Sequence, residues 1–363
     1  DIEITPAQLA LDPCSASAVI TDVNTGEVRA LVTYPSYDNN KFSGTVDAEY
    51  YNKLNNDQSL PLFNNATQAQ KAPGSTFKPI IAVAALEEGV IGLNDTVNCT
   101  GIYKEITPAL RCWIYPGQHG PLDVVHGIQN SCNVFFSEMG HRLSMDGNGN
   151  YSPELGIEKI RKYASMFGLD ETSGIEIAER EPQMTTEKPE ASSIGQGKNS
   201  YSNVQLSRYI TAVANKGTVF KLSLLDKMTD SQGNLLEDFT PEVRSVIDVK
   251  DSTWNAVHTG MRRVISDGSA RKIFSDLEVD IAGKTGTAEE IKNGHRINHA
   301  FFVSFAPYQN PEIAVTVNIP YGYSSSNAAT AAKNIYRFYY GYTDLNYILN
   351  NSALNSSNVE IGD

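Results

Sequence analysis

The chain has 363 residues, 40% of them hydrophobic and 20% charged, which suits one large globular domain or two smaller ones. Its net charge of −13 argues against a nucleic-acid partner, because such a partner selects a basic face. No stretch approaches the roughly 20 apolar residues that span a membrane, and no signal peptide precedes Asp1, so we expect a mature or truncated chain.

The first half of the sequence predicts a hairpin, a long loop region and then several helices. Residues 15–33 form two apolar runs around an Asn-Thr-Gly turn. Residues 34–74 are polar and rich in turn formers, and the apolar spacing after them predicts a helix that ends near Gly89. Residues 92–122 read as irregular, and further helices are expected at 123–130, 134–143, 157–167 and 203–215.

The second half predicts most of a sheet. Residues 218–250 read as strands around a polar turn, and a helix is expected at 252–265. Three strands follow at 279–285, 300–306 and 313–319, and a last helix at 328–340. The early hairpin and these late strands, with helices between them, predict an α/β (α+β) fold: an antiparallel sheet of about five strands sandwiched by helices. We expect one domain over residues 1–350 and an Asn/Ser-rich tail that frays over 351–363.

Three short motifs stand in an order that points to acyl-transfer chemistry. Ser75 and Lys78 are three residues apart, so their side chains share one face of a helix. A Ser-Cys-Asn segment follows at 131–133, and Lys-Thr-Gly-Thr at 284–287 ends a predicted strand. Each motif alone has an ordinary structural explanation as a helix cap, a turn or a solvated strand end. Together, in this order, they are typical of serine β-lactamases and penicillin-binding proteins.

The chemistry assigns a role to each of five predicted catalytic residues. Ser75 would attack a carbonyl carbon, Lys78 would accept its proton, and Ser131 would relay a proton to the leaving amine. A lysine accepts that proton only when it is uncharged, which burial and the nearby cation of Lys284 both favour. Asn133 would hold the backbone of the substrate.

Substrate binding is assigned to the last three residues of the strand motif. The hydroxyls of Thr285 and Thr287 would donate hydrogen bonds to a carboxylate of the substrate. Gly286 would let the strand lie close to the substrate, because a side chain there would block it. The backbone N–H groups of Ser75 and Thr287 are the expected oxyanion hole.

Three of the four cysteines are close in sequence to one histidine. Cys99, Cys112, His119 and Cys132 make a Cys3His set, typical of a structural zinc site with a closed tetrahedral shell. Since Cys132 is the middle residue of the second motif, a metal there would brace Ser131 and Asn133 from behind. One alternative is a Cys99–Cys112 disulfide, which would leave the other two residues unexplained. Another is that Cys132 is a buried small residue.

Three other residues, Asp123, His126 and Cys14, are assigned smaller roles or none. Asp123 and His126 are reserve ligands for the same ion, and His126 is expected on a helix surface. Cys14 stands apart from the other cysteines and is expected to be unpaired.

Longer segments resemble one family over nearly the whole chain. The stretches "ITDVNTGEVRALVTYPSYDNNKF", "PLFNNATQAQKAPGSTFKP", "SSIGQGKNSYSNVQLSRYITAVANKG" and "NHAFFVSFAPYQNPEIAVTV" resemble the transpeptidase domain of class B penicillin-binding proteins. The segments "YPSYD…PLFN" and "NHAFFVSFAPY" are similar to the elongation type, as in penicillin-binding protein 2. The resemblance implies a penicillin-binding/serine β-lactamase-like fold. Several members of the elongation type carry a zinc near the second motif, some with Asp at the position of Cys99 or Cys112.

The resemblance also implies a peptidoglycan D,D-transpeptidase of cell-wall elongation. Ser75 would be acylated by the D-Ala-D-Ala end of a stem peptide, and an amine of a neighbouring stem peptide would attack the ester. β-Lactams would acylate the same serine. Since no glycosyltransferase region is present, the implied partners are a membrane glycosyltransferase and other elongation proteins. The implied location is the extracytoplasmic face of the cell membrane, with an anchor and pedestal outside this sequence.

Other functions share these motifs and stay open at this point. A D-Ala-D-Ala carboxypeptidase differs mainly in whether water or an amine attacks the ester. A β-lactam sensor or a silent scaffold would bind without turnover. A serine β-lactamase would need a base that positions water, and only Glu176 and Glu179 are tempting.

Overall fold

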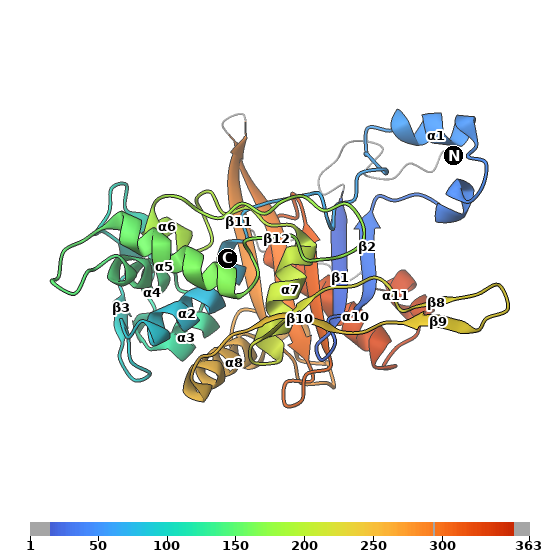
Figure 1. Cartoon of the computed structure of the whole chain (residues 1–363). Helices are drawn as coiled ribbons and strands as arrows, with labels where there is room; N and C mark the ends of the chain where they lie inside the picture. The colour runs from blue at the N-terminus through green and yellow to red at the C-terminus, as the bar shows by residue number, and fades with distance from the viewer. Residues whose placement is uncertain (1–14, 293–294, 352–363) are drawn as a thin grey trace.

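The computed structural model describes residues 15–292 and 295–351, and its centre is a five-stranded sheet (Figure 1). The strand order is β11-β12-β13-β1-β2, and every neighbouring pair is antiparallel. The strands are β1 (Ala16–Asp22), β2 (Val28–Tyr34), β11 (Ala282–Lys292), β12 (His295–Ala306) and β13 (Ile313–Ile319). The predicted sheet is confirmed, because the early hairpin joins the late strands through the pairing of β1 with β13.

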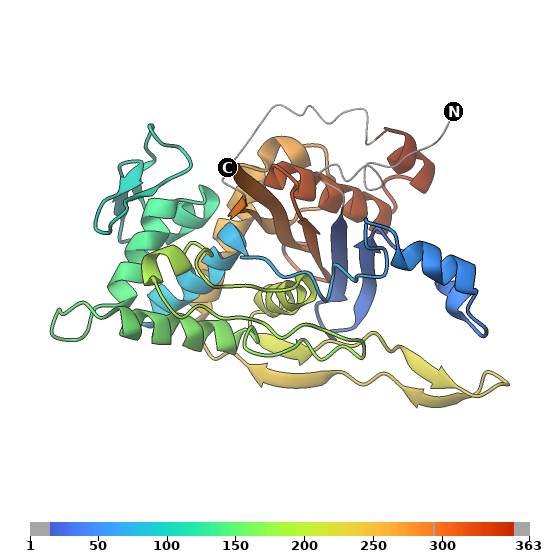
Figure 2. The same ribbon diagram turned by 90° about the horizontal axis from the view of Figure 1, so that it is seen from above.

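Helices cover both faces of the sheet, as predicted (Figures 1 and 2). On one face lies α7 (Asn203–Ala214), where the Thr211 hydroxyl hydrogen-bonds Thr21 of β1 at 2.5 Å. On the other lies α10 (Ser325–Tyr339), where the Tyr336 hydroxyl lies 2.9 Å from the Ser304 hydroxyl of β12. Because side chains alternate between the faces of a strand, β13, whose side chains are almost all buried, packs against both helices.

A lobe of helices lies beside the β11 edge of the sheet (Figure 2). The long α8 (Asp251–Ser266) connects the two parts, since it packs against β11 as well as against α2 and α3. The other helices of the lobe are α2 (Lys78–Glu87), α3 (Val124–Gln129), α4 (Asn133–Leu143), α5 (Pro153–Met166) and α6 (Pro189–Ser192). A short α9 (Arg271–Phe274) precedes β11.

Smaller elements occur where the sequence predicts loops. The region 92–122 contains the short strands β3 (Val97–Cys99), β4 (Ile102–Tyr103), β5 (Leu110–Arg111) and β6 (Gly120–Leu122). The region 34–74 contains η1 (Asn39–Phe42), α1 (Ala48–Asn55) and η2 (Gly74–Phe77). The strands expected within 218–250 form two small pairs: β7 (Thr218–Lys221) with β10 (Glu242–Val246), and β8 (Lys227–Thr229) with β9 (Leu235–Asp238). The β8–β9 pair and α1 project from the body (Figure 1).

Several element ends differ from the predictions. β11 continues to Lys292 because β12 pairs with it along its whole length. α5 starts before residue 157, because the Ser152 hydroxyl caps the helix and Pro153 occupies its first turn. α11 (Leu345–Asn351) crosses the predicted tail boundary at residue 350. Cys14 and the tail residues 352–363 lie outside the described residues. Within the described ranges, no helix has the length and apolar character needed to cross a bilayer.

Candidate active site

The predicted nucleophile lies at a tight turn in front of α2. Ser75 belongs to the 3₁₀ turn η2, and Lys78 is the first residue of α2, so the pair spans a junction rather than one α-helix. The Lys78 N–H donates to the Ser75 carbonyl oxygen. Residues i and i+3 of a 3₁₀ turn are eclipsed, so this geometry places both side chains on one side of the turn. Ser75 is half-buried and Lys78 is fully buried.

Lys78 joins the first and second motifs. Its Nζ lies 2.7 Å from the Ser131 carbonyl oxygen, 3.2 Å from Ser131 Oγ and 2.8 Å from Asn133 Oδ1. The side chain is also 5.6 Å from the centre of the Phe136 ring on α4. Residues that are more than fifty positions apart in sequence therefore meet at one buried amine.

The backbone between α3 and α4 turns Ser131 and Asn133 toward that amine. Ser131 has φ of +50°, a left-handed conformation that is uncommon for a residue other than glycine. Cys132 follows as the N-cap of α4, and its Sγ accepts a hydrogen bond from the Phe135 N–H at 3.3 Å. The Cys132 sulfur also lies 3.9 Å from Cys112 Sγ, whereas the residues on either side of Cys132 contact Lys78.

The third motif packs directly on the nucleophile turn. A Cβ built on Gly286 would lie 2.7 Å from Thr76 Cγ2 and 3.1 Å from the Pro73 carbonyl oxygen. A Cβ on Gly74 would lie 2.8 Å from the Thr287 carbonyl oxygen. The missing side chain of Gly286 thus makes room for the turn that carries Ser75, in addition to any substrate that lies along the strand as predicted.

A fourth segment, absent from the predicted site, closes around the same turn. The Gly74 N–H donates to the Gly195 carbonyl oxygen at 3.0 Å, and a Cβ on Gly195 would lie 1.8 Å from the Gly74 carbonyl oxygen. The Gly-Gln-Gly segment 195–197 was noticed only through the family resemblance. Its glycines were the one signal of such a close backbone approach.

The remaining residues of the β11 motif differ in their hydrogen bonding. Lys284 is fully buried, and its Nζ donates to the Thr285 carbonyl oxygen at 3.0 Å. The Thr285 hydroxyl lies 3.2 Å from the hydroxyl of Ser269, a contact that no sequence pattern indicated. Within the described part of the chain, Thr287 Oγ1 is buried and has no hydrogen-bond partner. Buried hydroxyls are normally paired, so this hydroxyl is an exception among the described residues.

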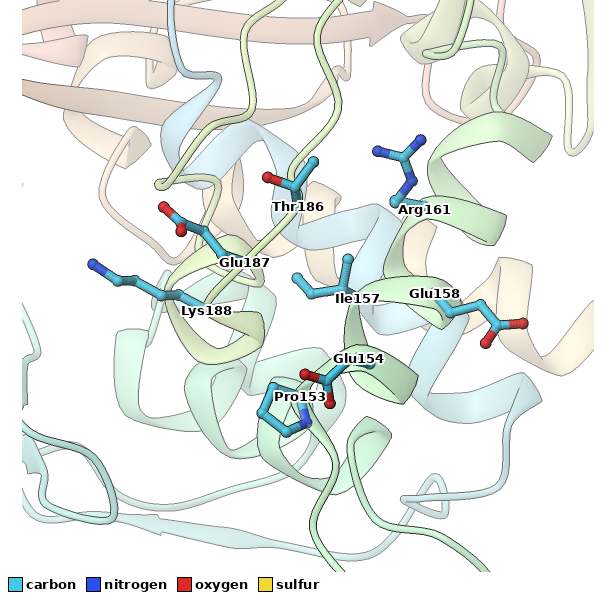
Figure 3. Close-up of a pocket in the computed structure, with 8 residues that line it drawn as sticks. All are labelled: Pro153, Glu154, Ile157, Glu158, Arg161, Thr186, Glu187 and Lys188. Carbon is cyan, nitrogen blue, oxygen red and sulfur yellow. The ribbon is translucent and has the colours of Figure 1, made fainter.

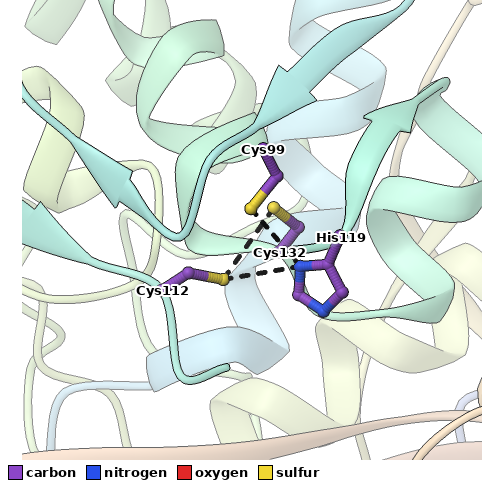
Figure 4. Close-up of side chains that lie close together, drawn as sticks. All are labelled: Cys99, Cys112, His119 and Cys132. Carbon is purple, nitrogen blue, oxygen red and sulfur yellow. Dashed lines mark hydrogen bonds between the residues drawn. The ribbon is translucent and has the colours of Figure 1, made fainter. Parts of the chain in front are cut away.

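The predicted metal ligands form one compact cluster (Figure 4). The candidate ligand atoms of Cys99, Cys112, His119 and Cys132 all lie within 4.8 Å of one another. His119 directs Nδ1 at the sulfurs, 3.4 Å from Cys99 Sγ and 3.7 Å from Cys112 Sγ. All three cysteines are buried free thiols. The alternative of a Cys99–Cys112 disulfide is therefore wrong for this structure.

The three thiols of the cluster shift one another's pKa values through hydrogen bonds. Hydrogen bonding with the Cys132 thiol lowers the pKa of Cys112 to about 3 and the pKa of Cys99 to about 6. The same contacts raise the pKa of the Cys132 thiol. For His119, burial lowers the pKa, but hydrogen bonds with Cys112 and Cys99 outweigh it and raise the value. Thiolates are the metal-binding form of cysteine, so the lowered pKa values of Cys112 and Cys99 favour ligation, whereas Cys132 and His119 would each have to give up a proton before binding a metal.

The reserve ligands lie outside this cluster. His126 Nδ1 is 2.8 Å from Asp123 Oδ1, and its Nε2 is 2.7 Å from Arg263 Nη1 of α8. The His126 side chain is 42% exposed, which agrees with the expected helix-surface position.

The two carboxylates considered for a β-lactamase are hydrogen-bonded to loops. Glu179 accepts hydrogen bonds from the Ser173 N–H and from Gln205 Nε2, each at 2.8 Å. Glu176 accepts from the Ser223 hydroxyl at 2.6 Å and from the Leu224 N–H at 2.8 Å. Each carboxylate thus serves to hold chain segments together.

A separate hollow lies between α5 and the segment that leads into α6 (Figure 3). None of the predicted catalytic, substrate-binding or metal residues lines it. Its lining consists of Pro153, Glu154, Ile157, Glu158, Arg161, Thr186, Glu187 and Lys188.

Comparison with known proteins gives one consistent result. Residues 16–337 match the family model described as the penicillin binding protein transpeptidase domain. A peptidoglycan D,D-transpeptidase MrdA of Haemophilus influenzae is 31% identical over 366 residues, which cover 91% of this chain and 53% of the relative. MrdA of Escherichia coli K12 is 31% identical over 351 residues, covering 88% and 53%. The chain spans about half the length of the curated relatives it matches.

Solved structures agree with the family model. PBP2 of Pseudomonas aeruginosa has a TM-score of 0.77 at 28% identity, covering 92% of this chain and 72% of the other. A chain from a peptidoglycan synthase complex has a TM-score of 0.79 at 25% identity, covering 91% and 56%. The fold and the elongation-type resemblance predicted from sequence are thereby confirmed.

Proposed function

Because the chain belongs to the penicillin-binding protein transpeptidase family, we propose that it is a peptidoglycan D,D-transpeptidase whose acyl-enzyme forms at Ser75. One observation supports the residue assignment most strongly: Lys78, which follows the Ser75 turn, contacts Ser131 and Asn133 through its Nζ. The strand β11 packs against the same Ser75 turn. The names of the MrdA relatives support the reaction type.

The proposed mechanism begins with attack of Ser75 Oγ on the carbonyl carbon of the penultimate D-Ala. Lys78, in its uncharged form, accepts the hydroxyl proton, and the backbone N–H groups of Ser75 and Thr287 bind the oxyanion. Collapse of the tetrahedral intermediate breaks the peptide bond, and Ser131 relays a proton from Lys78 to the departing amine of D-Ala. An amine of a second stem peptide then attacks the ester carbonyl, and the acyl C–O bond to Ser75 breaks. The proton that the amine loses passes through Lys78 to Ser75 Oγ, which regenerates the hydroxyl.

Substrate recognition is assigned to groups around the same amine. Asn133 is in place to hold the peptide backbone, although its Oδ1 is engaged by Lys78. Lys284 supplies positive charge beside the substrate carboxylate. The hydroxyls of Thr285 and Thr287 donate to that carboxylate, and the unpartnered Thr287 Oγ1 supports this assignment. A β-lactam enters by the same route, because its strained amide replaces the scissile bond.

The biological setting of the proposal is cell-wall elongation at the extracytoplasmic face of the membrane. The support is the sequence resemblance to the elongation type, together with relatives named as peptidoglycan D,D-transpeptidases. A structural relative belongs to a complex that coordinates polymerization and crosslinking, which supports a polymerising glycosyltransferase as a partner.

We further propose that the four clustered side chains hold a structural zinc ion. Three thiols and one imidazole nitrogen match the donor set of closed zinc sites. When bound, zinc would crosslink β3, the β5–β6 region and the start of α4. The left-handed Ser131 stands next to one ligand, so the crosslink would hold the second motif in place.

The reaction is tested with stem peptides that end in D-Ala-D-Ala, in the presence of an amine acceptor. The wild-type protein should release D-Ala and form crosslinked product, and Ser75→Ala should do neither. Release of D-Ala without crosslinking, at every acceptor concentration, would favour the carboxypeptidase. Penicillin labelling without any D-Ala release would favour the sensor.

A further inference from the structure

We propose that Lys71, Glu290 and His299 form a positioning network that sets the distance between β11 and the Ser75 turn. The inference rests on the proposed acyl transfer at Ser75. None of these three residues belongs to the motifs that carry the predicted chemistry. We assign them no contact with substrate.

Glu290 receives two hydrogen bonds on one carboxylate oxygen. Lys71 Nζ lies 2.7 Å from Glu290 Oε2, and His299 Nε2 lies 2.9 Å from the same atom. Lys71 precedes the Ser75 turn, Glu290 lies on β11, and His299 lies on β12 opposite Ala288. The network thus joins three chain segments that come together at the proposed site.

The proton on His299 can be assigned from its neighbours. The Tyr321 N–H donates to His299 Nδ1 at 3.1 Å, so Nδ1 carries a lone pair and the ring proton sits on Nε2. Nε2–H therefore donates to Glu290. Hydrogen bonds from Lys71, and then from His299, lower the pKa of Glu290, which keeps the carboxylate ionised at neutral pH. His299 is 1% exposed and packs against the Tyr321 ring, so its orientation is fixed.

The network lies at one end of a close-packed contact between residues 71–76 and β11. At the other end, Gly286 of β11 lies against Thr76. Between the two ends, Gly74 lies against the Thr287 carbonyl oxygen. Those inner contacts are close approaches across glycines, which limit how near the two segments come. The Lys71–Glu290 ion pair adds an electrostatic attraction between the same two segments.

The Lys71 end of the network is anchored in the backbone. The Lys71 N–H donates to the Tyr201 carbonyl oxygen at 3.3 Å, and the Tyr201 N–H donates to the Lys71 carbonyl oxygen at 3.0 Å. Loss of the ion pair would therefore let β11 move, while the segment from Lys71 to Ser75 stays in place. The Thr287 N–H, a proposed oxyanion donor, would move with the strand, and catalysis is sensitive to displacements of about 1 Å.

The test measures penicillin acylation of the whole chain as a saturable process, which separates the noncovalent dissociation constant from the acylation rate constant. Glu290→Leu removes both acceptor bonds and should lower the rate constant about tenfold, with the dissociation constant unchanged. Glu290→Gln keeps an oxygen that accepts both bonds and should lose less. Lys71→Met should match Glu290→Leu, the double variant should be no worse than either, and Lys71→Arg should restore most of the rate.

The matched control is Glu242→Leu, which breaks the Lys221–Glu242 pair of the separate β7–β10 sheet. It should leave acylation unchanged. Wild-type rate constants in Glu290→Leu, additive losses in the double variant, or losses explained by a lower Tm would each overturn the network. A wild-type protein that is never acylated would instead overturn the proposed function.

Discussion

The proposed site has two walls, which the fold holds in different ways. The α4 wall is the turn at 131–133, where Ser131 adopts a left-handed conformation between α3 and α4. Hydrogen bonds from Lys78 hold this turn on one side, and the cluster of three cysteines and His119 adjoins it at Cys132. The β11 wall is a strand that pairs with β12 along its whole length and packs under α8. A turn fixed by a few side chains should respond to substitution of any of them, whereas a paired strand should respond to backbone clashes and to loss of the Lys71–Glu290 ion pair.

Removal of the Lys78 amine should have the largest effect, because it removes both the hydrogen bonds that hold the α4 wall and the proposed base. Lys78→Ala should slow penicillin acylation by about 10²–10⁴-fold, the range of general acid–base catalysis. Stopped-flow acylation with a fluorescent penicillin measures this, and circular dichroism checks that the variant is folded. A rate constant within a few-fold of wild type would show that Lys78 is not the base.

A single methyl group should disturb the β11 wall. Gly286→Ala places a Cβ 2.7 Å from Thr76 Cγ2, so the strand has to move away from the Ser75 turn. We expect acylation to slow by about tenfold or more. Gly147→Ala is the control, because no atom lies within 4 Å of its built Cβ. Equal acylation rates in the two variants would show that this contact does not position the strand.

Loss of one sulfur should weaken the α4 wall from behind while β11 stays in place. Cys132→Ser keeps a good N-cap residue for α4 but removes a proposed zinc ligand. We expect the zinc content to fall from about one ion per chain, and the Tm to drop by about 5 °C. Acylation should slow by less than in Lys78→Ala. An unchanged Tm in the presence of bound zinc would show that the cluster braces nothing.

Acid should lower the stability of the whole domain without distinguishing the walls. Burial lowers the pKa of His258 on α8 to about 4, and its Nε2 lies 2.7 Å from the Val213 carbonyl oxygen. Between that value and about 6.5 the unfolded chain binds a proton that the folded chain does not, so stability falls as pH falls. The free energy of unfolding should drop by about 2 kcal/mol from pH 7 to pH 5 through this residue.

His258→Gln should remove that part of the pH dependence and leave acylation at neutral pH unchanged. Urea unfolding at both pH values measures the difference between the variant and wild type. An identical pH dependence would show that His258 titrates normally in the folded protein.

Some contacts of the proposed site follow the sequence motifs, and others do not. Ser75, Lys78, Ser131 and Asn133 were proposed because the reaction calls for those side chains, and the structure joins Lys78 to Ser131 and Asn133. The backbone contacts of Gly74 with Gly195 and of Gly286 with Thr76 were missed. Such contacts join distant segments, and a glycine in sequence does not say which segment approaches it.

Missed elements have similar physical causes. α1 is only eight residues long and Leu54 is its one buried residue, so the sequence predicts only a polar loop region there. The strands β3 to β6 are two or three residues long, too short for an alternating pattern. The Lys71–Glu290–His299 network depends on how β11 pairs with β12 beyond residue 287. The predicted strand ended at residue 285, so the network could not be predicted.

The most direct test is intact-mass analysis of the protein after penicillin treatment, with the modified residue mapped by peptide sequencing. One covalent adduct should form per chain, on the peptide that contains Ser75, and it should be absent from Ser75→Ala. An adduct on another residue, or an undiminished adduct in Ser75→Ala, would contradict the proposed acyl-enzyme.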